Sequence, residues 1–333
     1  MNGMRHPTPA SPAQRPLRRG WWTLLRPPNL LTVPGDPLAG FLLASAAASA
    51  AGLSAAPTGA AFALPGILDP AWARAGVAVA AALLIYLHGL IGNDLFDRKE
   101  DQRERPERPL PAGLNTPRAA TTLCLLTAAA GIALSWLNGS ASFGTALLLT
   151  ATVLLYNGVM KRFRILGPLF MGACRALGLA MGAVAAGWRG EGSAPTLVAI
   201  GLLGLYVAAV TAVAQNETRA TTLGFRRWLP AGVLAIGFGG VGWASHAAGI
   251  ATWGFALVLG IPTAAWAGWI GHRLAGQPAP QQVQASIGHW LRGLLVMQFC
   301  LASIGWGSLT VPGAVCLALW ACHVRLARRY YCT

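Results

Sequence analysis

The chain has 333 residues, of which 55% are hydrophobic and only 11% charged, and its mean hydropathy is +0.52. Water-soluble domains carry about 25% charged residues, so this composition excludes an ordinary soluble protein and predicts an integral membrane protein. The net charge of +15 would suggest nucleic-acid binding in a soluble chain, but here it has to be compared first with membrane topology.

We expect a polar cytoplasmic tail over residues 1–24 and a single transmembrane helical domain over residues 25–328. Stretches of about 17 to 25 mostly apolar residues can cross a bilayer as helices. Such stretches occur in chain order at 30–53, 74–93, 117–137, 143–160, 165–188, 196–214, 228–249, 252–271, 289–306 and 311–327. The predicted fold is therefore an all-α, polytopic transmembrane helix bundle of nine or ten spans.

Basic residues fall in alternate connections between these spans. If the N-terminus is inside, 22 of the 25 Lys and Arg residues lie on the inner side, including those in loops 94–116, 161–164 and 215–227. Short cytoplasmic loops carry such an excess, so topology explains the net charge and nucleic acid is not an expected partner. We expect a multi-pass protein of the bacterial inner (cell) membrane, in contact with membrane lipids, with its N-terminus in the cytoplasm.

Six of the ten acidic residues lie between positions 94 and 107, where the second predicted span ends. At about 100° per residue, Asp94, Asp97 and Asp101 share one face of a helix, with Asn93 beside them. Carboxylates gathered at a helix C-terminus need a compensating cation, and hard oxygen ligands suit Mg²⁺ together with substrate phosphates. The alternative is a solvated loop whose acids pair with neighbouring Arg and Lys residues at i, i+4 spacing.

The residues from Asn93 to Asp101 have the pattern N-D-x-x-D-x-x-x-D, and R-P-L-P-A-G follows from Arg108. This pattern, at the end of the second span, resembles the first aspartate-rich motif of the UbiA-type intramembrane prenyltransferases. The sequence L-R-P-P-N from Leu25 and the pair Tyr156-Asn157 agree with the same family. The resemblance covers roughly residues 24 to 320 and is stronger before about residue 190.

The resemblance implies an enzyme that transfers an isoprenoid chain from a prenyl diphosphate to an acceptor, with Mg²⁺ as cofactor. It implies catalytic roles for Asp94, Asp97 and Lys161. By position, the matching metal ligands are Asn93, Asp94, Asp97 and Asp101, and the residues expected to bind the substrate are Asn93, Arg108, Tyr156, Arg162 and Arg175. Arg175 lies inside an apolar span, so it either faces the same mouth or is a buried partner of Glu217 or of a helix C-terminus. The sequence does not indicate the identity of the acceptor, the length of the prenyl chain or the oligomeric state.

The second aspartate-rich motif of the family is incomplete in this chain. After the sixth span the sequence reads Gln215-Asn216-Glu217, so Glu217 is the single charged metal ligand expected there and would hold a second Mg²⁺ weakly. One-metal catalysis, an unusual donor, or a non-catalytic or transport-associated lipid-binding protein are the alternatives. The segment from Thr211 to Glu217 is similar to a divergent UbiA-like branch, sometimes labelled EboC, that is linked to export of secondary metabolites.

A secondary transporter is a further alternative. Ten spans would be compatible with it, but no duplicated halves are evident in the sequence. The acids also cluster at a helix end and not at the bilayer midplane, where transporters bind their substrates.

Overall fold

The computed structural model describes residues 17–53, 70–190, 194–215, 222–306, 315, 318–322 and 324–325, and the regular structure within them is helical. The helices of the first half are α1 (Leu17–Leu25), α2 (Pro27–Leu30), α3 (Gly35–Ala50), α4 (Pro70–Phe96), α5 (Arg98–Glu104), α6 (Pro117–Ser135) and α7 (Ser140–Gly158). Those of the second half are α8 (Leu166–Ala185), α9 (Ala194–Ala214), α10 (Leu229–Ala247), α11 (Trp253–Arg273) and α12 (Pro280–Trp306). Short 3₁₀ turns follow α6 at Trp136–Asn138 and α7 at Met160–Arg162, and a third precedes α10 at Gly224–Trp228.

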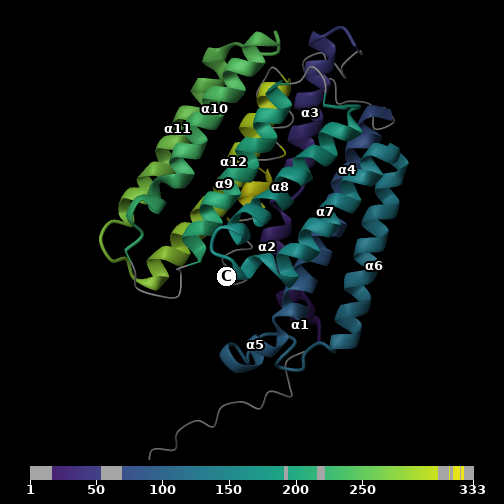
Figure 1. The fold of residues 1–333 in the computed structure, drawn as a ribbon, viewed down its shortest axis with the longest axis vertical. Helices are drawn as coiled ribbons and strands as arrows, with labels where there is room; N and C mark the ends of the chain where they lie inside the picture. Colours follow the sequence, from purple (N-terminus) through teal and green to yellow (C-terminus); the bar gives the residue numbers. More distant parts are fainter. Residues whose placement is uncertain are drawn as a thin grey trace, which may run out of the picture.

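Nine helical segments of the described residues are long and apolar enough to cross a membrane, and α2 and α3 together form the first of them. The prediction of an all-α, polytopic bundle is therefore confirmed. The long helices lie side by side in one bundle, with α1 and α5 at one end, which we call the charged end (Figure 1). Of the predicted tenth span at 311–327, only Val315, 318–322 and 324–325 lie among the described residues.

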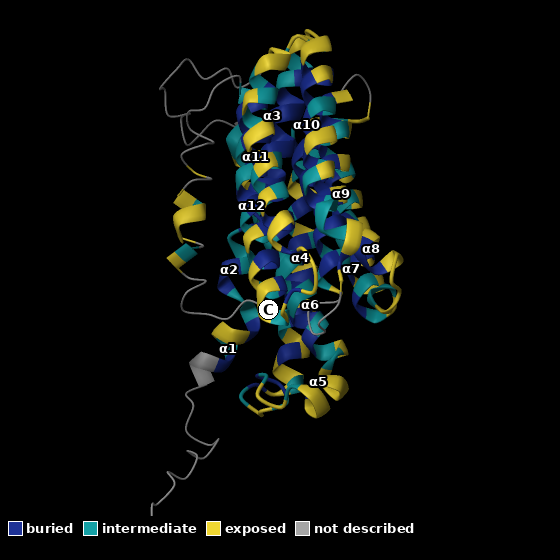
Figure 2. Cartoon of the chain, turned by 90° about the vertical axis from the view of Figure 1, so that its left-hand side faces the viewer, coloured by how far each residue is buried: buried dark blue, intermediate teal, exposed yellow. Residues whose placement is uncertain are grey.

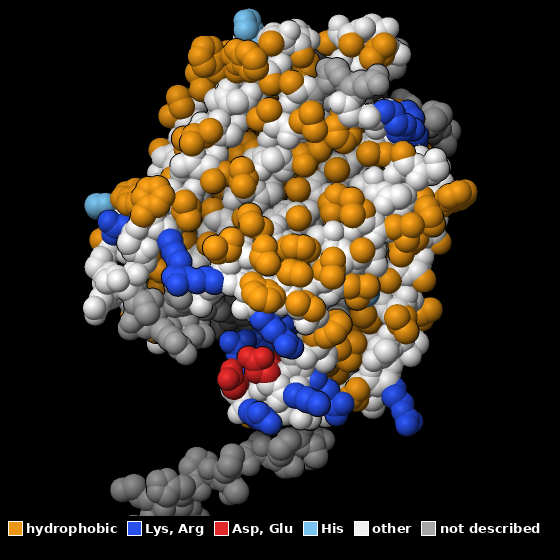
Figure 3. All heavy atoms as spheres, viewed as in Figure 1, with side chains coloured by type: hydrophobic (Ala, Val, Ile, Leu, Met, Phe, Trp, Pro, Cys, Tyr) orange, Lys and Arg blue, Asp and Glu red, His pale blue; other side chains and the backbone are white. Residues whose placement is uncertain are grey.

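Large apolar side chains point outward from the bundle as well as inward. Ile236 is 80% exposed and Val258 70% exposed, and exposed positions follow the outer faces of the helices (Figure 2). In water such surfaces would be costly, whereas lipid chains are as apolar as the side chains themselves. Charged side chains gather near the lower end of the face drawn in Figure 3, below a mostly apolar surface.

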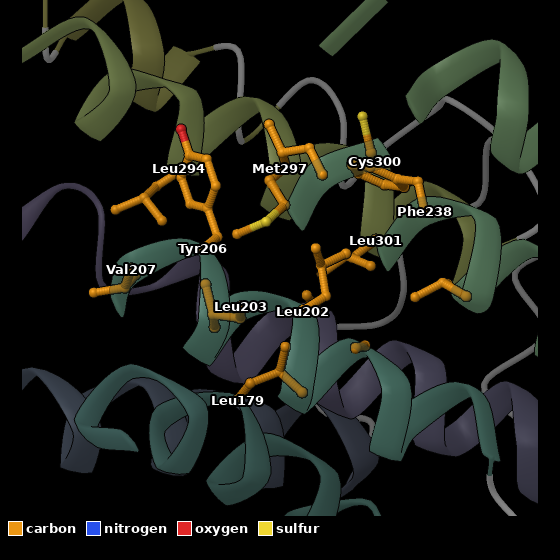
Figure 4. Close-up of a cluster of buried hydrophobic side chains, with 14 of the residues drawn as sticks. Leu179, Leu202, Leu203, Tyr206, Val207, Phe238, Leu294, Met297, Cys300 and Leu301 are labelled. Atoms are coloured by element: carbon orange, nitrogen blue, oxygen red, sulfur yellow. The ribbon is translucent and has the colours of Figure 1, made fainter. Parts of the chain in front are cut away.

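The largest buried cluster involves α3, α4 and α8–α12, and Figure 4 shows part of it, with labelled side chains from α8, α9, α10 and α12. Tyr206 is fully buried there, and its hydroxyl donates a hydrogen bond to the backbone oxygen of Trp290 at 2.8 Å. The Trp290 indole nitrogen in turn donates to the backbone oxygen of Ala267 at 3.2 Å. Buried polar atoms need such partners, and these two bonds tie α9, α11 and α12 together.

Two helix boundaries differ from the sequence prediction at the charged end. The predicted second span ends at position 93, but α4 continues to Phe96, because the Asp97 backbone nitrogen still bonds to the Asn93 oxygen at 2.9 Å. The predicted tail contains most of α1, in which Leu24 is fully buried and packs with Ile91 and Leu110. The apolar residues of α1 recur at helical spacing, so one face of α1 packs against the bundle.

Helices α3 and α8 approach each other more closely than side chains would allow. A Cβ atom added at Gly182 would meet the backbone of Pro37, and one added at Gly40 would meet the backbone oxygen of Leu179. Small residues permit this approach in membranes, where close packing stabilises helix association. The first and fifth spans are therefore in direct backbone contact over the part of α8 that follows Gly178.

We expect Gly182→Ala to lower the midpoint of thermal unfolding in detergent, with a cost of about 1–3 kcal/mol, because the added methyl group meets backbone that cannot rotate away. Gly201→Ala in α9 is the matched control, since nothing lies within 4 Å of a Cβ at that position. Equal unfolding midpoints for the two variants would contradict the close contact of α3 with α8.

Candidate functional site

The carboxylate of Asp94 lies at the end of α4, in a buried position, and is paired with a basic residue from another span. Arg26 Nη2 donates to Asp94 Oδ1 at 2.6 Å, and Arg108 Nη1 lies 3.8 Å from the same oxygen. Arg108 also donates to Asp101 Oδ2 at 2.8 Å. Asp94 and Asp101 are only 4% and 5% exposed, so Arg108 joins two buried carboxylates and holds the turn after α5 against the end of α4.

Arg26 has an unusual backbone. Its φ of 44° makes it the one non-glycine residue with positive φ in the described part of the chain. This conformation costs of order 1–3 kcal/mol and persists only where the surroundings impose it, often at functional sites. The turn between α1 and α2 therefore holds the Arg26 side chain toward Asp94.

Lys161 is the ion-pair partner of Asp97, as Arg26 is of Asp94. The Lys161 ammonium pairs with Asp97 Oδ1 and donates to Asn93 Oδ1 at 3.1 Å. Lys161 belongs to the 3₁₀ turn after α7, so the fourth span supplies the cation for acids at the end of the second. Within the described ranges, the pairs Asp94–Arg26 and Asp97–Lys161 thus join residues 68 and 64 positions apart and not neighbours at i, i+4, which argues against the simple charged-loop alternative.

The mouth formed by these side chains is close to neutral. Three cations, Arg26, Arg108 and Lys161, face three carboxylates, Asp94, Asp97 and Asp101. No group of three or more His, Cys, Asp or Glu side chains that could hold a metal ion occurs among the described residues. The oxygen donors present suit Mg²⁺, which needs only one or two carboxylates when substrate phosphates complete its coordination.

A cavity of about 270 Å³ extends from this mouth into the bundle. Its walls come from α4 between Ala82 and Asn93, α7 between Leu149 and Asn157, and α8 between Met171 and Gly178. Arg26 and Asp36 complete it from the first span. The cavity combines apolar side chains with a few polar groups, as small-molecule sites do, and it brings Asn93 and Arg26 of the mouth together with residues deep in the membrane.

Asp36 and Arg175 form an ion pair deep in this cavity. Arg175 Nε lies 2.9 Å from Asp36 Oδ2, and Arg175 Nη2 donates to the backbone oxygen of Thr32 at 2.6 Å. Gln298 of α12 donates to the same Thr32 oxygen at 2.7 Å and to Asp36 Oδ1 at 2.5 Å. Asp36 and Gln298 are 2% and 0% exposed. The first, fifth and ninth spans are thus joined through one buried carboxylate.

The structure brings most of the predicted site residues together. Asn93, Tyr156 and Arg175 line the cavity. The ion-pair network of Asp94, Asp97, Asp101, Arg108 and Lys161 adjoins the cavity through the lining residues Arg26 and Asn93. Arg162 is exposed and does not line the cavity. Arg175 is paired with Asp36 and not with a helix C-terminus. Glu217 lies outside the described residues.

Sequence reasoning missed three contributors: Arg26 as a partner of Asp94, and Asp36 with Gln298 around Arg175. A signal for Asp36 was present, because Asp36 and Arg175 are opposite charges that each interrupt an apolar span. Isolated charges of opposite sign in two spans point to a buried pair. Gln298 is likewise a lone polar residue within an apolar span, but nothing in the sequence indicates that it faces Asp36.

Comparison with known proteins settles the family. The model of the UbiA prenyltransferase family matches residues 51–292. The chain belongs to this family. With nine apolar helices of membrane-spanning length among its described residues, this UbiA family member is an integral, multi-pass membrane protein.

Curated relatives resemble parts of the chain. A digeranylgeranylglyceryl phosphate synthase of Metallosphaera sedula is 34% identical over 106 residues, which is 32% of this chain and 37% of the relative. A protein of the same name from Thermococcus gammatolerans is 37% identical over 95 residues, covering 28% of this chain and 34% of the relative. The chain thus matches little more than a third of the length of these relatives.

Solved structures share the fold over most of the chain. A structure reported for digeranylgeranylglyceryl phosphate synthase superposes with a TM-score of 0.59 at 14% identity, covering 87% of this chain and 99% of the other. A UbiA homologue from Archaeoglobus fulgidus, bound to DMAPP and Mg²⁺, gives 0.56 at 14% identity, covering 88% and 99%. At this identity the likeness concerns the fold alone.

We expect Arg108→Met to release the segment after α4, because the buried carboxylate of Asp101 then loses a cation 2.8 Å away. A hydrogen bond to a charged group contributes about 1.5–3 kcal/mol, so the open population should rise by at least about tenfold. Cleavage by a glutamate-specific protease after Glu100 or Glu104, followed by mass spectrometry of the fragments, measures it. Arg103→Met, at an exposed position, is the control, and equal cleavage rates would refute the anchoring role of Arg108.

Proposed function

We propose that this protein is a Mg²⁺-dependent prenyltransferase that moves an isoprenoid chain from a prenyl diphosphate to an acceptor. The observation that carries the proposal is the cavity whose mouth combines Asn93 and three carboxylates with three cations, Arg26 from the start of the first span, Arg108 from the loop after α5 and Lys161 from the turn after α7. The acceptor is open, and the names of the curated relatives make a glyceryl phosphate one class to test. The charged end, with the basic turns after α7 and before α10, is proposed to face the cytoplasm.

The charge balance at the mouth supports a metal requirement. A diphosphate carries several negative charges, whereas the three cations of the mouth are already matched by three carboxylates. Binding therefore needs additional positive charge, which Mg²⁺ held by Asp94 and Asp97 would supply at the diphosphate and its leaving oxygen. Asn93 and Asp101 are proposed as further oxygen ligands, and Glu217 stays a prediction.

The side chains of the mouth and cavity can carry out the remaining work. Lys161, Arg26 and Arg108 would donate hydrogen bonds to diphosphate oxygens and stabilise the charge that develops when the bond to the prenyl C1 breaks. Tyr156 and Asn157 line the wall between the mouth and the interior. The apolar walls would exclude water from the prenyl carbon until the acceptor reacts with it. Arg162 is proposed to bind the incoming substrate from its exposed position, and Arg175 is proposed to contact the substrate within the cavity.

Asp94→Asn and Asp97→Asn should each reduce the gain in prenyl diphosphate affinity that Mg²⁺ provides, by at least about tenfold, since each removes a charged metal ligand. The measurement is calorimetric titration with geranyl diphosphate, with Mg²⁺ and with EDTA, on protein in nanodiscs. Glu100→Gln, at an exposed position, is the control. Unchanged Mg²⁺ dependence in both Asp variants would rule out the metal site.

Turnover separates an enzyme from the alternative, a non-catalytic lipid-binding protein, which the single carboxylate of the second motif favours. We expect Mg²⁺-dependent release of diphosphate when the purified protein is incubated with prenyl diphosphates and glyceryl phosphate lipids or phenols as acceptors. Lys161→Met should lower the rate about 100-fold, as loss of one charge-stabilising donor does elsewhere, while the exposed Lys99→Met leaves it unchanged. Binding without release for every acceptor would support the lipid-binding function.

A further inference from the structure

The inner end of the cavity is lined on one side by charged side chains, whereas prenyl chains are apolar and need apolar surroundings. Asp36 and Arg175 line this end, and both are buried, at 2% and 7% exposed. Thr32 and Gln298 hold the pair from behind through hydrogen bonds. Because Gln298 and Thr32 belong to the ninth and first spans, the pair cannot swing aside without disrupting the packing of α3, α8 and α12.

Directly beyond the pair, no passage continues between α3 and α8. A Cβ added at Gly178 would lie 3.5 Å from Asp36 Oδ2, which is ordinary van der Waals contact. One turn further along, Gly182 and Gly40 bring the two helix backbones together. The ion pair is therefore the last layer of the cavity on this side, and the backbone contact behind it blocks further extension.

The depth of the cavity follows from the helix that lines it. From Asn93 at the mouth to Ala82 at the inner end, α4 rises about 16 Å, and to Tyr86 about 10 Å. The Arg175 guanidinium carbon lies 5.9 Å from the centre of the Tyr86 ring, so the ion pair begins at about the Tyr86 level. An extended isoprene unit adds four backbone bonds and spans about 4–5 Å. Two units reach the ion pair, and a third fills the space beside it.

We propose that the Asp36–Arg175 pair acts as a polar floor that limits the donor to a prenyl diphosphate of two or three isoprene units. The inference rests on the proposed function, because it assumes that the mouth binds the diphosphate and that the chain extends inward. A fourth unit would have to press against a desolvated ion pair that gains no hydrogen bond in return, or leave the cavity for the lipid.

The test is a chain-length series on the full protein in nanodiscs with Mg²⁺. The probes are the thiolo-diphosphate analogues of dimethylallyl, geranyl, farnesyl and geranylgeranyl diphosphate, which do not turn over, and empty nanodiscs correct for partition into lipid. We expect affinity to rise about tenfold from the first to the second member, as newly buried hydrocarbon requires. From the third to the fourth member it should not rise further.

The variant that tests the floor is Asp36→Ala combined with Arg175→Met. Removing both partners avoids an unpaired buried charge, and apolar replacement of a buried pair is commonly tolerated. We expect the double variant to bind the geranylgeranyl analogue about tenfold more tightly, relative to the dimethylallyl analogue, than the wild-type protein does. Tyr206→Phe is the matched control, because it removes a buried hydrogen bond remote from the cavity and should leave the series unaltered.

The outcomes separate the two proposals. If the ion pair only joins the spans, the double variant should lose stability and all four affinities should change equally. That result would overturn the polar floor and leave the transferase proposal standing. A wild-type affinity that keeps rising to the geranylgeranyl analogue would overturn the floor as well. No Mg²⁺-dependent binding of any analogue would overturn the proposed function together with this inference.

Discussion

Among the described residues each buried carboxylate is matched with an arginine, and the rest of the structure depends on these pairs. In a bundle with apolar surroundings an unpaired charge costs far more than it does in water. Asp36, Asp94 and Asp101 are all nearly inaccessible, and each has an arginine as partner. These pairs link the first span to the second and fifth, and they place the charged side chains in and around a single cavity.

Pairing also explains how the mouth can exist before a substrate arrives. Three carboxylates at one helix end would repel one another, but Arg26, Arg108 and Lys161 separate them. In the proposed function, the same cations would turn to phosphate oxygens, and a metal ion would take their place beside the carboxylates. Exchange of partners at constant charge is a cheaper way to bind a diphosphate than creating a charged site from an uncharged one.

The deeper pair has a different character. Asp36 and Arg175 are held by Thr32 and Gln298 as well as by each other, and close packing of α3 and α8 supports them from behind. Such a network is rigid because each member is fixed by several partners. The cavity thus has a charged mouth whose ion pairs can exchange partners and an inner end that is fixed. In the proposed function, the mouth would bind the diphosphate and the inner end would limit the length of the prenyl chain.

The sequence by itself determined the membrane class, the approximate positions of the spans, nine or ten in number, and the cluster from Asn93 to Asp101, because hydropathy and local spacing are properties of neighbouring residues. It placed Lys161 near the mouth only through family resemblance. The tertiary structure decided the pairing of Arg26 with Asp94 and of Asp36 with Arg175, which are 68 and 139 positions apart. Contacts between spans depend on helix rotation and close approach at glycines such as Gly182, and no local pattern encodes which faces will meet.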